Sequence, residues 1–560
     1  MTTALAPPRQ QLTNAEPIPR RSVNQTLCAA THVTEGFADY TAHIFDGGPR
    51  GGAPYITEDP VALLRHAVTA KRSRSYRDVV CALVAVAIFA TVVGRLADPL
   101  GHPPAVVTVV ALIAGWRLRQ RIRHALRTWC AWAWRSKWDR RQPGPLRWVA
   151  GVACAALLAA VVLLRQPVLW HCVAVVLAGL AVGWVVVVAE SVLAHRRAAA
   201  ILAEGAPDPR RLARPAGKDQ ERRAAGLIGA NVIAYAESRA SAPFVGNGFI
   251  VRPWKMDIDI HRRAPDADDR NAGAFEIFDV IAFHEWLDSH FQLETAVEST
   301  ASRRLTAGHR LYVDGRKLGW RSPLLRDGRP VSTVDWDHLA AELRHGERAD
   351  DQRVYFYLQE VCRDGAIGIC TLVRPLVQGG SLSIEFVPLV LPPVHPDVEA
   401  LIAELPASTR DHFGRAVRTW TPHLASTVFG APGRCAKRLL GWMAKLSGRA
   451  RWRLAARYGW HYDLGAVMSV REGVCWREPD EFDHFVIQDL IRINDHLRDR
   501  LVTSIKAYLR DRGIDTGQLD ADVRITQIQN WNVGNVRADM VGFGNNNTFG
   551  SPGRDAGGEE

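Results

Sequence analysis

Two aspartates and a histidine alternate with apolar residues along one short segment. Asp257, Asp259 and His261 belong to the run WKMDIDIHR. In a β-strand this spacing places the three polar side chains on one face, where they could bind a divalent metal or serve as paired carboxylates in acid and base catalysis. A solvated strand face gives the same pattern. Both interpretations therefore stay open at this point.

A second group of titratable residues lies in FEIFDVIAFHEWLDSHF. His284 and Glu285 are followed by His290, six positions after His284. A zinc-protease helix needs its second histidine four positions after the first, so that both lie on one face. The spacing therefore predicts an ordinary helix surface and no metal site.

Glycine-containing segments resemble phosphate-binding loops only in part. The segment 430–438, GAPGRCAKR, lacks the order GxxxxGK[ST], and the GNG of 246–248 lacks a third glycine and a following helix. No GxSxG elbow occurs, and the nine cysteines include no CxxC pair. The sequence thus predicts no cofactor, identifies no catalytic residue and leaves enzymatic activity undecided.

The sequence around these residues predicts strands and helices that together form an α+β domain over 226–543. NVIAYAES and PFVGNGFIV are typical of two strands with a Gly-Asn-Gly turn, and the runs RVYFYLQEVC, IGICTLVRPL and LSIEFVPLVL predict an antiparallel β-meander. Helices are expected over 275–292, 335–346, 396–457 and 481–512, with breaks in the third at Pro406, Pro422 and 430–433. A closing hairpin and a disordered tail, 544–560, follow.

An apolar region, 78–190, precedes this domain and predicts a membrane protein with four α-helical transmembrane segments in two hairpins. The expected spans are 79–97, 104–116, 148–164 and 168–189. The first and last approach the ~20 residues that cross ~30 Å of hydrocarbon, whereas 104–116 is short and its full crossing stays open.

Charge sets the expected orientation of these spans. Arginine and lysine crowd into the loop 117–147 and into the residues before 79, whereas the turn DPLGHP has neither. By the positive-inside rule the loop, the N-terminal segment 1–77, the linker 191–225 and both termini are cytoplasmic. We therefore expect a multi-pass protein of the cell membrane.

The basic loop is also rich in tryptophan, which favours the lipid interface. Tryptophan rings lie at head-group depth, and arginines reach phosphates. A cytoplasmic extension of the next span is the alternative. The expected membrane-interface residues are Trp116, Arg117, Arg121, Trp129, Trp132, Trp134, Trp138 and Trp148.

A second basic segment, 434–457, mixes arginine and lysine with tryptophan, leucine and methionine. It fits an amphipathic helix on an anionic leaflet, but a domain helix with a charged outer face is the slightly favoured interpretation. The formal net charge of +12 is explained by lipid head groups, so no nucleic-acid partner is expected. The expected spans hold almost no ionisable residue, which argues against a transporter or channel.

Three features together suggest a family. RSVNQTLCAATHV, the two hairpins around an Arg/Trp-rich loop, and APFVGNGFIVRPW resemble uncharacterised multi-pass membrane proteins of Streptomyces and related actinobacteria. The resemblance implies a cytoplasmic C-terminal domain and brings no activity with it.

Two functions of different classes remain. The favoured hypothesis is a membrane-anchored cytoplasmic interaction or signalling module that binds a protein or a small molecule. The alternative is a membrane-tethered enzyme, with Asp257, Asp259, His261 and His284 as its site. A deep polar pocket joining those four residues would favour the enzyme, and scattered positions would favour the module.

Overall fold

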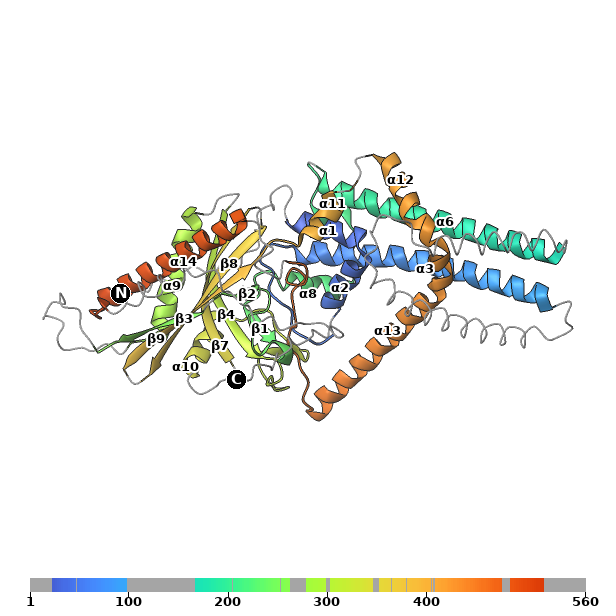
Figure 1. The fold of residues 1–560 in the computed structure, drawn as a ribbon. Coiled ribbons are helices and arrows are strands. Elements are labelled where there is room, and N and C mark those ends of the chain that lie inside the picture. Colours follow the sequence, from blue (N-terminus) through green and yellow to red (C-terminus); the bar gives the residue numbers. More distant parts are fainter. Residues whose placement is uncertain are drawn as a thin grey trace, which may run out of the picture.

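The computed structural model describes residues 23–97, 167–475 and 484–517, apart from 47, 204, 252, 262–277, 299–302, 346–351, 364, 379, 404 and 406–407. A helical part and a sheet part meet in the middle of the molecule (Figure 1). The expected closing hairpin, the tail and the spans 104–116 and 148–164 lie outside the described residues.

The helical part begins with two short helices and contains two very long ones. Helices α1 (Val23–Val33) and α2 (Glu35–Phe45) pack beside α3 (Pro60–Ala97) and α6 (Pro167–Leu202). Both long helices have the length and apolar composition to cross a membrane. Each continues well beyond the segment expected to span, because α3 starts at Pro60 and α6 ends at Leu202.

The apolar stretches of α3 and α6 lie side by side and extend away from the sheet (Figure 1). Only 17% of the apolar stretch of α6 is buried, whereas a core helix would be mostly covered. Exposed apolar residues are Val79, Val80, Leu83 and Val86 on α3, and Trp170, Leu177, Val182 and Val185 on α6.

Two glycines allow this region to pack closely. A Cβ at Gly179 would lie 2.5 Å from Ile88 Cδ1 of α3, and one at Gly183 would lie 2.5 Å from Val428 Cγ2. The spacing is that of GxxxG, which lets helix backbones approach each other in apolar surroundings. This is a sequence signal that the pattern of apolar runs alone does not reveal.

The sheet part is built on a seven-stranded mixed sheet. Its order is β1-β4-β7-β8-β9-β2, with β3 also paired to β9. Its strands are β1 (Val232–Tyr235), β2 (Phe249–Ile250), β3 (Trp254–Asp259), β4 (Arg303–Asp314), β7 (Gln352–Cys362), β8 (Ile367–Gln378) and β9 (Ser381–Leu391).

The expected meander is present as β7, β8 and β9, which pair antiparallel. The sheet as a whole is not antiparallel, because β1 pairs parallel with β4. The two strands expected around the Gly-Asn-Gly turn do not pair with each other. They lie at opposite edges of the sheet, β1 on β4 and β2 on β9.

Two helices cover one face of this sheet. Helices α9 (Val280–Glu298) and α14 (His484–Asp511) bury Phe283, Phe291, Leu497 and Leu501 against strand residues such as Phe356. At the β1 end, α10 (Trp336–His345) and the hairpin β5 (Leu325–Arg326) and β6 (Arg329–Pro330) complete a further apolar cluster.

The remaining helices connect the two parts. They are α7 (Pro209–Leu212), α8 (Lys218–Ala225), the 3-10 turns η2 (Glu237–Arg239) and η4 (Thr421–His423), α11 (Pro396–Ala403), α12 (Thr409–Trp420) and α13 (Leu424–Tyr458). The prediction of a helix break at 430–433 is wrong, because α13 runs through Pro432 without interruption. Buried Ala431 packs on α3 there, and Arg434 donates to the Thr427 carbonyl about two turns earlier (2.6 Å).

Candidate functional site

The carboxylates singled out in the sequence lie on the outer side of an edge strand. In β3, Asp257 and Asp259 alternate with the buried Met256 and Ile258. Asp257 pairs with Lys255 at 3.3 Å, and a hydrogen bond from Ser383 lowers the pKa of its carboxyl. Asp259 accepts the backbone N–H of His261 at 2.9 Å. These are the contacts of a solvated strand.

His284 lies elsewhere, in the core between α9 and the sheet. It is fully buried, and neither of its ring nitrogens has a hydrogen-bond partner among the described residues. Its ring centroid is 5.2 Å from that of His309, and burial holds the pKa of His284 well below its ordinary value. Since β3 turns its polar face away from α9, the structure does not bring His284 together with Asp257, Asp259 and His261.

No group of three or more histidine, cysteine, aspartate or glutamate side chains with the geometry of a metal site occurs in the described part of the chain. Burial raises the pKa of the Cys370 thiol to about 11, so this thiol stays protonated and unreactive near neutral pH. The expected membrane-interface residues, which run from Trp116 to Trp148, all lie outside the described residues.

A cluster of ion pairs lies where the exposed apolar surface of α3 begins. Asp78 is fully buried and contacts Arg77 at 3.0 Å, Arg434 at 3.1 Å and Arg438 at 2.7 Å. Arg77 reaches across to Glu190 of α6 at 3.3 Å. Because a buried charge is stable only when paired, this cluster holds α3, α6 and α13 together.

Arg471 forms a second buried connection, between the helical part and the sheet. Its side chain is only 1% exposed and pairs with Glu58 at 3.1 Å, ahead of α3. It also donates to the hydroxyl of Thr57 and to the carbonyls of Gly365, Ala366 and Pro392. One guanidinium thus joins three segments that are distant in sequence.

The neighbouring Glu472 fixes the Gly-Asn-Gly loop. Its carboxylate accepts the backbone N–H groups of Gly246 (2.7 Å) and Gly248 (3.2 Å), and both glycines have φ near +90°. At Gly248 a Cβ would also overlap the backbone of Val390. The loop is therefore a structural turn that requires glycine, and its N–H groups already have a partner.

Asn247, at the centre of this loop, connects it to the buried side of the sheet. Its side chain donates to the Tyr312 hydroxyl at 2.8 Å and accepts from Arg310, whose guanidinium also donates to Gln359 (3.2 Å). The guanidinium stacks on the Tyr357 ring, 4.0 Å from its centroid. Neutral acceptors and an aromatic face thus surround a buried cation.

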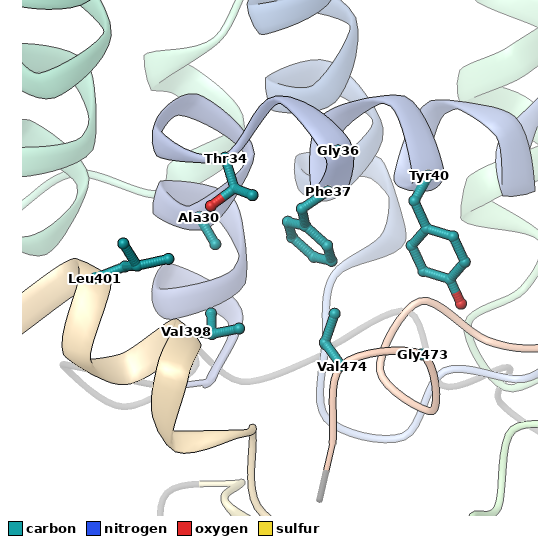
Figure 2. A pocket seen from close by; sticks show the side chains of 9 residues that line it. All are labelled: Ala30, Thr34, Gly36, Phe37, Tyr40, Val398, Leu401, Gly473 and Val474. Atoms are coloured by element: carbon teal, nitrogen blue, oxygen red, sulfur yellow. The ribbon is translucent and has the colours of Figure 1, made fainter. Parts of the chain in front are cut away.

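A small apolar pocket lies at the same junction (Figure 2). It encloses about 280 Å³. Its lining consists of Ala30, Thr34, Gly36, Phe37, Tyr40, Val398, Leu401, Gly473 and Val474.

Figure 2 shows the side chains of α1 and α2 facing α11 on one side and the 473–474 loop on the other. Tyr40 closes one end, where its hydroxyl lies 3.1 Å from the Ser469 carbonyl. A Cβ at Gly473 would overlap that hydroxyl, so glycine is required there. The pocket has an apolar floor and few polar groups, which suits an apolar ligand group and not a charged one.

Comparison with known families assigns the C-terminal half of the chain. A family model described as the AbeC-like domain matches residues 253–548, which is more than half of the chain. The chain belongs to the AbeC-like domain family. No curated protein and no solved structure matches it.

The match starts at β3, so β1, β2 and helices α1 to α8 precede the AbeC-like region. The region includes Arg434, Arg438 and Arg471, whereas their partners Asp78 and Glu58 lie before it. The ion pairs described above therefore connect the AbeC-like region to the long helices. An aspartate directly after Arg77, at the start of an apolar run, is the sequence signal for the first of these connections.

Proposed function

We propose that this chain is a membrane-anchored interaction module, in which α3 and α6 hold the AbeC-like region at the inner face of the cell membrane. The observation that carries the proposal is the position of the Asp78 cluster. Exposed apolar surface lies on one side of it and a folded junction on the other. Such a boundary is what a membrane protein needs where hydrocarbon ends and polar surroundings begin.

In this proposal the chain crosses the membrane four times, with 104–116 and 148–164 as the inner pair of spans and both termini in the cytoplasm. The absence of lysine and arginine from DPLGHP and their density in 117–147 support this orientation. Trp116, Arg117 and the other aromatic and basic residues of that loop then lie at the lipid interface.

Reporter or cysteine-labelling sites at 102, 135, 166 and 222 test the anchor. Labelling from outside at 102 and 166 only is the expected result, together with retention of the chain in carbonate-washed membranes. External labelling at 135 or 222 would contradict the proposed topology, and release of the chain by carbonate would contradict the anchor itself.

We further propose that the pocket takes an apolar side chain of a partner protein. At about 280 Å³ it is smaller than most pockets for drug-sized ligands, which occupy ~300–1,000 Å³. Its walls come from both α1–α2 and the AbeC-like region, so an occupant would contact both parts at once. That arrangement suits a module whose two parts respond to one partner.

A matched pair of variants tests the pocket. Gly36 lines the pocket, and nothing lies within 4 Å of a Cβ there; Gly414 on α12 is equally open but lies outside the pocket. A photo-crosslinking residue at Leu401, on the rim, should capture a defined partner in native membranes. Gly36→Leu should abolish that adduct and Gly414→Leu should keep it. Equal yields in both variants would refute the pocket as the binding site.

A further inference from the structure

The longest helix of the AbeC-like region has an unusual charge composition. α13 spans 35 residues and contains no aspartate or glutamate. It contains eight basic residues, Arg434, Lys437, Arg438, Lys445, Arg449, Arg451, Arg453 and Arg457. A helix on an ordinary domain surface mixes both signs of charge, which pair along and across it.

α13 is held at its two ends. At its start, Val428 and Ala431 are buried against Cys81, Ala85 and Val187, within the apolar stretches of α3 and α6. Towards its end, Trp452 packs near the β5–β6 hairpin, with the Arg329 guanidinium 5.6 Å from its ring centroid. The helix therefore starts beside the apolar helices and returns to the sheet part (Figure 1).

Between these contacts the helix is mostly exposed, although Lys445 pairs with Asp46. Every residue from 439 to 447 is exposed, although Leu439, Trp442, Met443 and Leu446 follow the i, i+3, i+4, i+7 spacing of a buried stripe. Leu440 beside the stripe is 64% exposed, and Trp442 is 58% exposed. An apolar stripe of this size on a helix that also binds at both ends indicates an interaction surface.

The charges around the stripe favour an anionic occupant. Arg434 and Arg438 form ion pairs with Asp78, and Lys445 forms one with Asp46. Lys437, Arg451 and Arg453 are exposed and form no ion pair with any described residue. In sequence, Lys437 precedes the stripe, directly before Arg438 of the Asp78 cluster, and Arg451 and Arg453 follow it.

We propose that the 437–453 segment of α13 binds the anionic phospholipid surface of the membrane. This inference rests on the proposed membrane anchor, which puts the Asp78 cluster at the inner boundary. An apolar stripe with a central tryptophan, flanked by unpaired basic residues, matches the interface of an anionic leaflet, where acyl chains accept the stripe and phosphates accept the cations. The AbeC-like region then contacts lipid directly as well as through α3 and α6.

Photo-crosslinking in nanodiscs tests this surface. The full-length chain carries p-benzoylphenylalanine at Leu440, and a matched chain carries it at Leu293, a leucine of α9 on the sheet part that is 73% exposed. In phosphatidylglycerol nanodiscs we expect lipid adducts from position 440 and none from position 293. In phosphatidylcholine nanodiscs the adducts at 440 should fall severalfold.

Neutralising variants test the electrostatic part of the proposal. Each of Lys437→Gln, Arg451→Gln and Arg453→Gln should lower the lipid-adduct yield in phosphatidylglycerol by up to about fivefold. One basic residue near an anionic surface strengthens binding to that surface by about this factor. The same substitutions should leave the yield in phosphatidylcholine unchanged.

The other outcomes each overturn the inference. A crosslinked dimer would identify a second copy as the occupant, and an intrachain crosslink would identify another segment of this chain. A chain that stays in carbonate-washed membranes but gives no lipid adduct at 440 refutes the α13 surface and leaves the anchor standing. Loss of the chain from the membrane would instead refute the anchor.

Discussion

Helices α13 and α14 have similarly spaced apolar residues, but those of α14 are buried and those in the middle of α13 are exposed. α14 buries Ile493, Leu497, Leu501 and Ile505 against the sheet and carries both aspartates and arginines on its outer side. α13 leaves its central apolar stripe exposed, and all of its charged residues are basic. The spacing of apolar residues thus shows that a helix has a face to cover, and the charge on the rest of the helix indicates what covers it.

The same contrast extends to the helix ends. α14 is fixed by its whole length on a rigid sheet, whereas α13 is fixed by an ion-pair cluster at one end and a tryptophan contact at the other. Variants that act on one helix and spare the other can therefore test whether α13 is a peripheral element or part of the core.

The largest effect is expected at Asp78. Asp78→Asn leaves Arg434 without a carboxylate partner and Arg438 with Glu35 alone, which should lower the free energy of unfolding by about 3–5 kcal/mol and release the start of α13. Asp46→Asn removes a partly exposed pair with Lys445 and should cost less than about 1 kcal/mol. Chemical unfolding in detergent and the rate of tryptic cleavage within α13 measure both. Similar values for the two variants would show that the cluster does not hold the helix.

The next effect compares one leucine on each helix. Leu497→Ala on α14 empties a fully buried position and should lower the free energy of unfolding by about 2–5 kcal/mol. Leu440→Ala on α13 should change it by less than about 0.5 kcal/mol, because the side chain is mostly exposed. The apparent melting temperature of the chain in detergent is the measurement. A comparable loss at both positions would mean that α13 is covered in the isolated chain.

A smaller effect is expected where α13 meets α6. Gly183→Leu forces a side chain into Val428 and should cost about 1–3 kcal/mol by overpacking. Gly441→Leu, in the exposed part of α13, meets nothing within 4 Å and should stabilise the helix by up to about 1 kcal/mol. Thermal unfolding of the two variants side by side gives the sign of each change. Tolerance of leucine at 183 would argue against close packing of α13 on α6.

The smallest effect concerns the core beneath α9 and α14. His284→Leu removes two ring nitrogens that have no partner and should stabilise the chain by about 1 kcal/mol. Because burial depresses the pKa of His284 in the folded chain, the unfolded chain binds its proton more readily, and stability falls as pH drops below about 6.5. Melting temperatures between about pH 7 and pH 5 should therefore decline less steeply in the variant. An unchanged slope would mean that the imidazole is already hydrated.

Local sequence patterns predicted the elements that depend on local signals. The three strands of the meander are runs of β-branched and aromatic residues separated by glycine turns, and α14 has a long regular apolar stripe. Strand β4 was not predicted because both of its faces are buried and include His309 and Arg310, which read as surface residues in sequence. Its parallel pairing with β1 depends on tertiary contacts that no local pattern encodes.

The candidate site could be predicted only in part. The basic apolar segment 434–457 was recognised, but its open middle could not be, because exposure depends on where its two ends attach. Glu58 and Arg471 gave no pattern, since each finds its partner in a segment far away in sequence. The adjacent Arg77 and Asp78 were visible in the sequence, but their distant partners Arg434 and Arg438 were not. Asp257, Asp259, His261 and His284 did form a pattern, and the structure separates them.

α3 is one unbroken helix of 38 residues, which at ~1.5 Å per residue is a rod nearly 60 Å long. Its far end carries the exposed apolar surface, and its near end packs against α1 and α2, two walls of the pocket. A rod without a hinge converts any axial slide or twist at one end into the same slide or twist at the other. A displacement of the apolar end of α3 would therefore be transmitted along the helix to α1 and α2, which line the pocket.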